Sequence, residues 1–187
     1  MRYFTVYLII TFVSIGGCTA QNTSTENLNV ILITIDTLRA DHLSCYGYQR
    51  PTSPHIDAFA KNATVFKRVY SSAPWTVPAI ASMFTGKYSF EHGAHTFKVQ
   101  EPRNNVNPLD ASYVTLAEVL KKEGYKTGAF VANAGFLSER WQLNQGFDTY
   151  HVERVYAKVL NKNIFEWIDA QKGKNFFLFI NYIDTHW

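Results

Sequence analysis

The chain has 187 residues, of which 47% are hydrophobic and 16% aromatic, and this is enough for one globular domain with a hydrophobic core. Its 18 basic and 15 acidic residues give a formal net charge of +3, and they form no basic stripe or long run. This pattern argues against a protein that binds nucleic acid. The sequence also contains no internal repeat.

Residues 1–20 are typical of an export signal and not of a folded domain. The apolar run from Tyr3 to Ile15 is too short to span a bilayer as a helix of the mature protein. The small residues before Cys18 resemble a bacterial lipobox, although Ile15 stands where leucine is more usual. Two interpretations stay open: Cys18 is the lipidated first residue, or an ordinary signal peptide is cleaved near Ala20. Both predict an exported bacterial protein, in the periplasm or, as a lipoprotein, at the outer membrane.

Residues 21–28 are polar and are predicted to form a tether between this signal and the domain that starts at residue 29. If Cys18 carries lipid, Cys45 has no cysteine partner left in the chain. The sequence therefore predicts no disulfide framework and no cysteine-based metal site, and Cys45 is interpreted as a packed residue.

The first part of the domain alternates between strand and helix patterns. Residues 29–35 form a nearly unbroken β-branched apolar run, which predicts a central strand buried on both faces, and Asp36 follows at its carboxyl end. Ser53 and Pro54 precede apolar residues at i, i+3, i+4 and i+7, which predicts a helix. Residues 64–70 alternate in the manner of a strand.

A short apolar helix is predicted after Thr76. Pro78 presets φ for a first helical turn, and Gly86 suits the left-handed residue that follows a last turn. Thr76 then lies where backbone N–H groups and the helix dipole favour an anion. It is interpreted either as an ordinary N-cap or as a hydroxyl nucleophile beside an anion pocket.

The second part continues the alternation. Residues 86–112 are predicted to be an irregular excursion. Thr115 and Glu118 predict a capping box, with Gly124 closing the helix. Further predicted elements are a strand at 127–132, a helix at 153–172 and a buried strand at 176–183.

This order of elements predicts an α/β fold with a mainly parallel sheet flanked by helices. Ligands of such sheets bind at the carboxyl ends of the strands. Asp36, Thr76 and the pair Asp184 and His186 all follow predicted strands, so we expect a site there. The chain stops just after a strand, so we expect residues 29–187 to be the N-terminal part of a catalytic domain.

Several motifs, in order, resemble the sulfatase family of the alkaline phosphatase superfamily. Residues 29–47 resemble its opening strand and loop, and residues 54–60 its first helix. Residues 76–88 resemble its nucleophile motif. Residues 124–127 resemble the start of a later strand, and residues 177–186 the strand that delivers an active-site histidine.

The resemblance implies a role for three residues. Asp36 matches a metal-binding aspartate. Thr76 matches the nucleophile, which also contacts the metal, and His186 matches a histidine that contacts the sulfate and the leaving oxygen. The implied cofactor is a divalent metal ion, calcium by family default, with zinc or manganese also possible. The implied partner is a sulfated or phosphorylated small molecule, glycan or lipid, with a membrane contact through Cys18.

The chain departs from the family pattern at four places. Thr37 stands where many sulfatases have a second metal-binding aspartate, and Ile80 replaces an arginine of the nucleophile motif. Thr76 replaces the cysteine or serine that is converted to formylglycine. Residues 132–135 contain no match to the lysine and histidine that hold the sulfate.

Four hypotheses remain. The first is a metal-dependent hydrolase of sulfuric or phosphoric esters with Thr76 as nucleophile. A threonine ester has no elimination route and must be attacked at sulfur or phosphorus, so a phosphoester is favoured over formylglycine-type sulfatase chemistry. The second is a transferase that passes a phospho-alcohol group to a lipid or glycan. The third is an inactive exported relative that binds a sulfated or phosphorylated glycan. The fourth, a small complete binding domain of 187 residues, is disfavoured because the chain stops abruptly after a strand. The remaining metal ligands are expected after Trp187, and the chain alone is expected to be inactive.

Overall fold

The computed structural model describes residues 28–95 and 106–186. The predicted signal at residues 1–20 with Cys18, and nearly all of the tether, lie outside these residues. Four strands form one sheet: β1 (Val30–Ile35), β2 (Lys126–Val131), β3 (Thr149–Val152) and β4 (Phe176–Tyr182). The described residues also form five α-helices: α1 (Pro54–Ala60), α2 (Thr76–Thr85), α3 (Ser89–His92), α4 (Leu116–Lys122) and α5 (Ala157–Ala170). Short 3-10 helices lie at Ala40–His42, Ser44–Tyr46 and Glu139–Trp141. Across the two described stretches, we find no helix of the length and apolarity that a membrane crossing needs.

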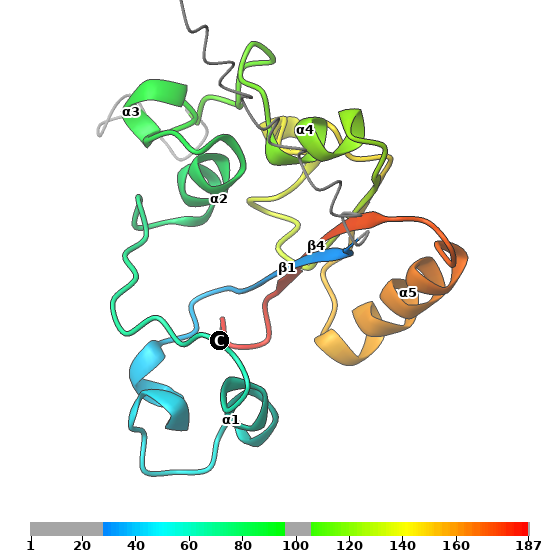
Figure 1. The fold of residues 1–187 in the computed structure, drawn as a ribbon. Coiled ribbons are helices and arrows are strands. Elements are labelled where there is room, and N and C mark those ends of the chain that lie inside the picture. Colours follow the sequence, from blue (N-terminus) through cyan, green and yellow to red (C-terminus); the bar gives the residue numbers. More distant parts are fainter. Residues whose placement is uncertain (1–27, 96–105, 187) are drawn as a thin grey trace, which may run out of the picture.

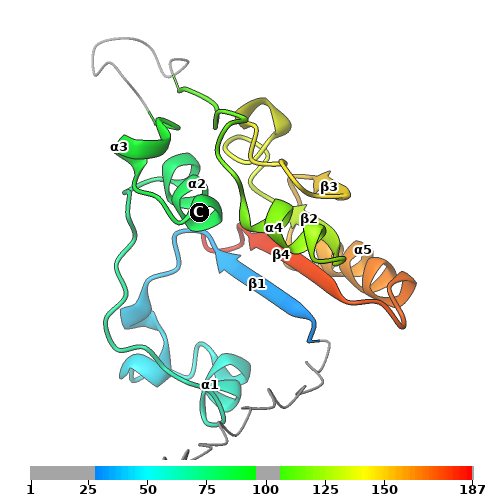
Figure 2. The same cartoon turned by 45° about the horizontal axis from the view of Figure 1, so that its top comes forward.

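The sheet is parallel throughout, with the strand order β1-β4-β2-β3 (Figure 2). Helices α2 and α4 cover one face and α5 covers the other, so the molecule has three layers (Figure 1). Each face has its own core, one built around Phe177 and Phe179 and the other around Leu178 and Ile180. The predicted α/β class is therefore confirmed.

The strand with the strongest apolar run is the one that is buried on both faces. The residues of β4 from Phe176 to Asn181 are all buried, because β1 and β2 pair with its two edges and helices cover both its faces. We expected β1 to be buried on both faces as well, and among the described residues this prediction is wrong. Strand β1 lies at the edge of the sheet, and Ile31 and Ile33 are 49% and 52% exposed because α5 lies over β2 and β4 and does not reach them.

Two other expectations need correction. Residues 64–70 form no strand, and Val69 and Tyr70 are 74% and 85% exposed. Their alternation is not sufficient because no neighbouring strand pairs with them. The helix after Ser53 is present as α1, but it ends at Ala60 and buries no residue.

The start of α5 differs from the predicted start of the long helix. The chain from Thr149 to Val152 pairs with β2 as a short strand that the sequence did not predict, so α5 begins at Ala157 instead of residue 153. The Asp184 carboxylate accepts the Ala157 N–H at 3.0 and 3.1 Å and so fixes the first turn. The capping box of Thr115 and Glu118 at the start of α4 is confirmed.

Candidate active site

Asp36 is held where β1 ends. Its N–H donates to the Tyr182 carbonyl at 2.8 Å, which carries the β1–β4 ladder one residue further. The Thr185 hydroxyl donates to the Asp36 carbonyl, and the Thr37 hydroxyl donates to the Thr185 carbonyl at 3.0 Å. This reciprocal pair joins the turn after β1 to the turn after β4. The backbone of Asp36 is therefore fixed by groups other than its carboxylate, which is left for the site.

Thr76 is the first residue of α2, and its side chain caps no backbone N–H. The N-cap position belongs to Trp75, and no side-chain cap bond is made there. The Thr76 hydroxyl instead donates to Asp36 Oδ2 at 3.4 Å. The N-cap interpretation of Thr76 is therefore wrong. The helix otherwise follows its sequence pattern, with Pro78 in the first turn and Gly86 left-handed at φ 68°.

Asn133 is a third member of the site, and it was not predicted from the sequence. It follows β2 and is 4% exposed. Its Nδ2 donates to Asp36 Oδ2 at 2.5 Å and lies 3.5 Å from Thr76 Oγ1. The family resemblance directs attention to charged side chains in this stretch, and it contains none. The available signal was a polar residue just beyond the carboxyl end of a buried strand, the same signal that singled out Asp36.

Asp36 and Thr76 line a cavity of ≈ 430 Å³ beside the carboxyl ends of the strands, and Asn133 lines a smaller hollow next to it. The lining of the cavity includes His186, so the structure brings the three predicted site residues, Asp36, Thr76 and His186, to one cavity. Trp75 and Phe136, whose rings meet edge to face at 5.8 Å, supply apolar wall. Asp184, which the sequence placed on the same rim, faces the start of α5 instead.

The cavity lining is neutral apart from Asp36 and any charge that His186 carries. Its polar groups include the hydroxyls of Thr34, Thr37 and Ser71, and no lysine or arginine of the described residues lines it. Ile80 lines it as an apolar residue at the position where the resemblance leads one to expect arginine. The Thr34, Thr37 and Ser71 hydroxyls donate their protons to the carbonyls of Ile180, Thr185 and Ala73.

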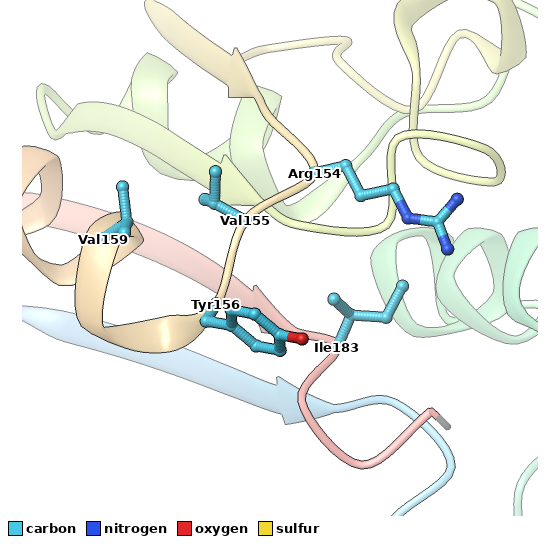
Figure 3. Close-up of a pocket in the computed structure, with 5 residues that line it drawn as sticks. All are labelled: Arg154, Val155, Tyr156, Val159 and Ile183. Atoms are coloured by element: carbon cyan, nitrogen blue, oxygen red, sulfur yellow. The ribbon is translucent and has the colours of Figure 1, made fainter.

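Two further hollows continue along the same edge of the sheet. One of ≈ 140 Å³ is lined by residues 133–136, Arg154, Ile183 and His186, and so shares Phe136 and His186 with the first. The next, of ≈ 330 Å³, shares Arg154 and Ile183 with the second. Figure 3 shows this outer hollow, with Tyr156 directed toward Ile183 and the Arg154 side chain extending from the segment after β3.

The side-chain oxygens at the site are of the kind that bind a divalent cation. Asp36 and Thr76 offer a carboxylate and a hydroxyl within 3.4 Å of each other, which are hard ligands of the kind that calcium and manganese prefer. Within residues 28–95 and 106–186, no three His, Cys, Asp or Glu side chains come close enough together to hold a metal ion. The described residues therefore form no complete metal site by themselves.

A hydroxyl and a carboxylate lie in contact at the edge of a parallel sheet where its strands end. This arrangement is typical of the active sites of α/β enzymes. Residues 28–187 match the family model described as Sulfatase. The chain belongs to the sulfatase family, within the alkaline phosphatase superfamily.

Curated relatives and solved structures agree with this assignment. An N-acetylgalactosamine-6-O-sulfatase of Bacteroides thetaiotaomicron is 31% identical over 105 residues, which cover 56% of this chain and 20% of that protein. The chain thus spans about a fifth of that relative's length. The phosphonate monoester hydrolase of Agrobacterium radiobacter has a TM-score of 0.68 and 21% identity, over 84% of this chain and 41% of that one. The C-terminal periplasmic domain of EcEptC from Escherichia coli, in a complex with Zn, has a TM-score of 0.61 and 18% identity, over 84% and 44%.

Proposed function

We propose that the whole protein is a metal-dependent hydrolase of sulfuric or phosphoric esters in which Thr76 is the nucleophile. The observation that carries this proposal is the contact of Thr76 Oγ1 with Asp36 Oδ2 at the start of α2. A hydroxyl at this position has a carboxylate on one side and the positive end of a helix dipole beside it. The helix dipole favours a developing alkoxide, and the carboxylate accepts the hydrogen bond of the proton that must leave.

Asp36 and Thr76 are the residues that would hold the metal ion. A bound divalent cation lowers the pKa of a hydroxyl and neutralises the anionic oxygens of the ester, which a threonine nucleophile needs at neutral pH. The similar EcEptC domain is a complex with Zn, while the carboxylate and hydroxyl oxygens of this chain also suit calcium or manganese. The identity of the metal is therefore tested by titration and not assigned.

The reaction proceeds in two displacements. Thr76 Oγ1 releases its proton along its hydrogen bond toward Asp36 and on to solvent, and then attacks the phosphorus or sulfur atom. An O–P or O–S bond forms, the bond to the leaving oxygen breaks, and that oxygen keeps the electron pair. His186, as the imidazolium, gives it a proton. Water then attacks the same atom and gives a proton to the neutral His186, which restores the imidazolium, while the Thr76 oxygen leaves and takes a proton from solvent.

The row of hollows supports an elongated substrate. The ester group lies in the cavity with Asp36 and Thr76, and the alcohol part extends past His186 toward Arg154. An arginine and an exposed tyrosine around apolar side chains suit a sugar that carries an anionic group. The related N-acetylgalactosamine-6-O-sulfatase is named for a sulfated amino sugar, which supports a sulfated or phosphorylated glycan over a lipid.

The location proposed for the protein is outside the cytoplasm of a bacterium, at the end of a lipidated tether. The support is the apolar run before Cys18, and the related EcEptC domain is described as periplasmic. Radiolabelled palmitate should enter the whole protein and be absent from Cys18→Ala. If palmitate labels the wild type and Cys18→Ala equally, the lipid anchor at Cys18 is contradicted. If Cys18→Ala stays in the cytoplasm, export by ordinary cleavage near Ala20 is contradicted.

The test of the function is Thr76→Ala in the whole protein. Aryl sulfate, aryl phosphonate and phosphodiester substrates are assayed with and without calcium, zinc or manganese. We expect metal-dependent turnover, fastest on a phosphorus ester, and a loss of roughly 10⁴-fold or more in kcat for Thr76→Ala.

Thr85→Ala is the matched control, because Thr85 lies at the far end of the same helix and its hydroxyl bonds only within that helix and its cap. It should keep full activity. Turnover that needs an added alcohol acceptor supports the transferase instead. The inactive glycan-binding relative is supported if the wild type hydrolyses none of the esters with any of the metals.

A further inference from the structure

Arg154 lies where two of the three hollows along the edge of the sheet meet. It lines the hollow of ≈ 140 Å³, which His186 also lines, and the outer hollow of ≈ 330 Å³. Its side chain extends away from Val159, out of the segment that follows β3 (Figure 3). Among the described residues, no other arginine and no lysine lines any of the three hollows. The row therefore has its permanent positive charge in the two hollows that follow the cavity of Thr76.

The other side chains of the outer hollow are mostly apolar. Val155, Val159 and Ile183 line it together with Tyr156, which is 60% exposed. Apolar walls keep water away from a charge, and an ion pair is stronger where less water screens it. The ring and hydroxyl of a tyrosine suit a group with both apolar and polar faces, such as a sugar ring. The outer hollow thus suits the body of an alcohol, and Arg154 suits an anionic group attached to it.

The position of Arg154 places it at the alcohol part of a substrate and not at the reacting ester. In the proposed reaction, the ester lies in the cavity that Asp36 and Thr76 line, and Arg154 does not line that cavity. A guanidinium has five N–H donors in a planar fork, so it can bind an oxyanion through two bonds and keep a contact within the protein. Arg154 is therefore suited to a second oxyanion, separate from the ester.

We propose that Arg154 selects substrates whose alcohol part carries a second anionic group, such as a carboxylate, in addition to the ester that Thr76 attacks. This inference rests on the proposed function, since it takes the two outer hollows as the place of the alcohol part. It narrows the substrate class to sugars or other alcohols with at least two anionic groups. Arg154 is then a specificity residue, which binds the substrate and takes no part in breaking the ester bond.

The test uses pairs of substrates that differ by one charge. The sulfuric and methylphosphonic esters of meta- and para-hydroxybenzoate have the reactive ester and a carboxylate on one ring. The corresponding esters of the methyl hydroxybenzoates keep the ring and the reactive ester and lose the second charge. The whole protein with its metal is assayed on both kinds. The ratio of the two kcat/KM values then isolates the response to the second anionic group.

Two substitutions at Arg154 separate charge from geometry. Arg154→Met removes the charge and keeps a long side chain. It should lower kcat/KM for the carboxylate substrates by roughly 10- to 100-fold, through KM, and leave the methyl hydroxybenzoate substrates unchanged. Arg154→Lys keeps the charge without the planar fork, so it should recover part of this loss.

Lys158→Met is the matched control, because Lys158 is exposed in the first turn of α5 and lines none of the three hollows. It removes the same charge and should keep the wild-type ratio. If Lys158→Met loses the preference as Arg154→Met does, the preference comes from the general surface charge and the proposal is overturned. Equal losses on both kinds of substrate in Arg154→Met, or an unchanged ratio, also overturn it.

The second readout needs no turnover. Binding of meta- and para-hydroxybenzoate, and of their methyl esters, to the whole protein is measured by ligand-observed NMR. We expect the carboxylates to bind the wild type and Lys158→Met more tightly than the methyl esters do, and Arg154→Met to lose this difference. Equal binding of carboxylate and methyl ester by the wild type overturns the contact. A wild type that hydrolyses no ester contradicts the proposed function instead, and the NMR comparison still tests the contact with Arg154.

Discussion

His92 is a buried histidine that connects α3 to the helix that carries Thr76. It is 2% exposed, and its Nδ1 accepts the Ala94 N–H at 3.0 Å. Because Nδ1 accepts, Nε2 carries the proton and donates to the Ser82 hydroxyl at 2.9 Å. Burial is the main cause that lowers the pKa of His92 below 6.5, with the nearby His95 adding to it. The imidazole is thus built into the core as a neutral group.

This environment makes the stability of the fold depend on pH. Below about pH 6.5 the unfolded chain binds a proton at His92 that the folded chain resists, so stability falls as the pH decreases from 7.5 to 5.5. His92→Gln should lose about 1–3 kcal/mol at pH 7.5 through the imperfect replacement of two buried hydrogen bonds. It should also show a smaller decrease between the two pH values. Urea unfolding at both pH values measures this, and equal slopes for the two proteins contradict it.

At the same scale, the site was predicted in part. Asp36 and Thr76 could be found because each stands beside a strong pattern, a buried strand and a short helix that runs from proline to glycine. Asn133 could not be assigned, because its role depends on the fold of residues 97 positions away and on the Phe136 N–H that orients it. An asparagine after a strand is common, and only its contact with Asp36 in the fold places it at the candidate site.

Among the elements, those with local signals were predicted well. The capping box of α4 and the apolar run of β4 are confirmed, because their stabilising contacts are with residues near in sequence or follow from burial on both faces. Strand β3 was missed because its four residues are all half-buried and therefore show no clear alternation of buried and exposed positions. Gly146 before it has φ 86°, and a Cβ there would lie 2.3 Å from the Glu118 N atom. Glycine is therefore needed at that turn, although the reason becomes clear only once α4 is placed beside it.

In the whole molecule, the site lies at the open side of the sheet. Strand β1, which delivers Asp36, has β4 on one edge and no described strand on the other. Its outward residues Ile31 and Ile33 are about half exposed. We predicted a central strand because the residues of β1 are apolar and β-branched. Such residues prefer burial, but the sequence does not show which other segment covers them. The same holds for the site, since the sequence patterns that single out Asp36 and Thr76 do not show which other groups lie beside them.

Metal binding by the isolated chain tests how much of the site these residues provide. A polypeptide of residues 21–187 offers Asp36 and Thr76, and the described stretches contain no group of three His, Cys, Asp or Glu side chains that could hold a metal ion. Affinity for a hard cation rises with the number of charged oxygen ligands, so one carboxylate should bind calcium or manganese no more tightly than about 10⁻³ M. Titration calorimetry on this polypeptide and on the whole protein measures the difference, with Asp36→Asn as the control in both. Tight one-to-one binding by the polypeptide would mean that Asp36, Thr76 and their hydroxyl neighbours suffice. Weak binding by the polypeptide together with tight, Asp36-dependent binding by the whole protein would mean that Asp36 is one member of a ligand set completed by residues beyond those described.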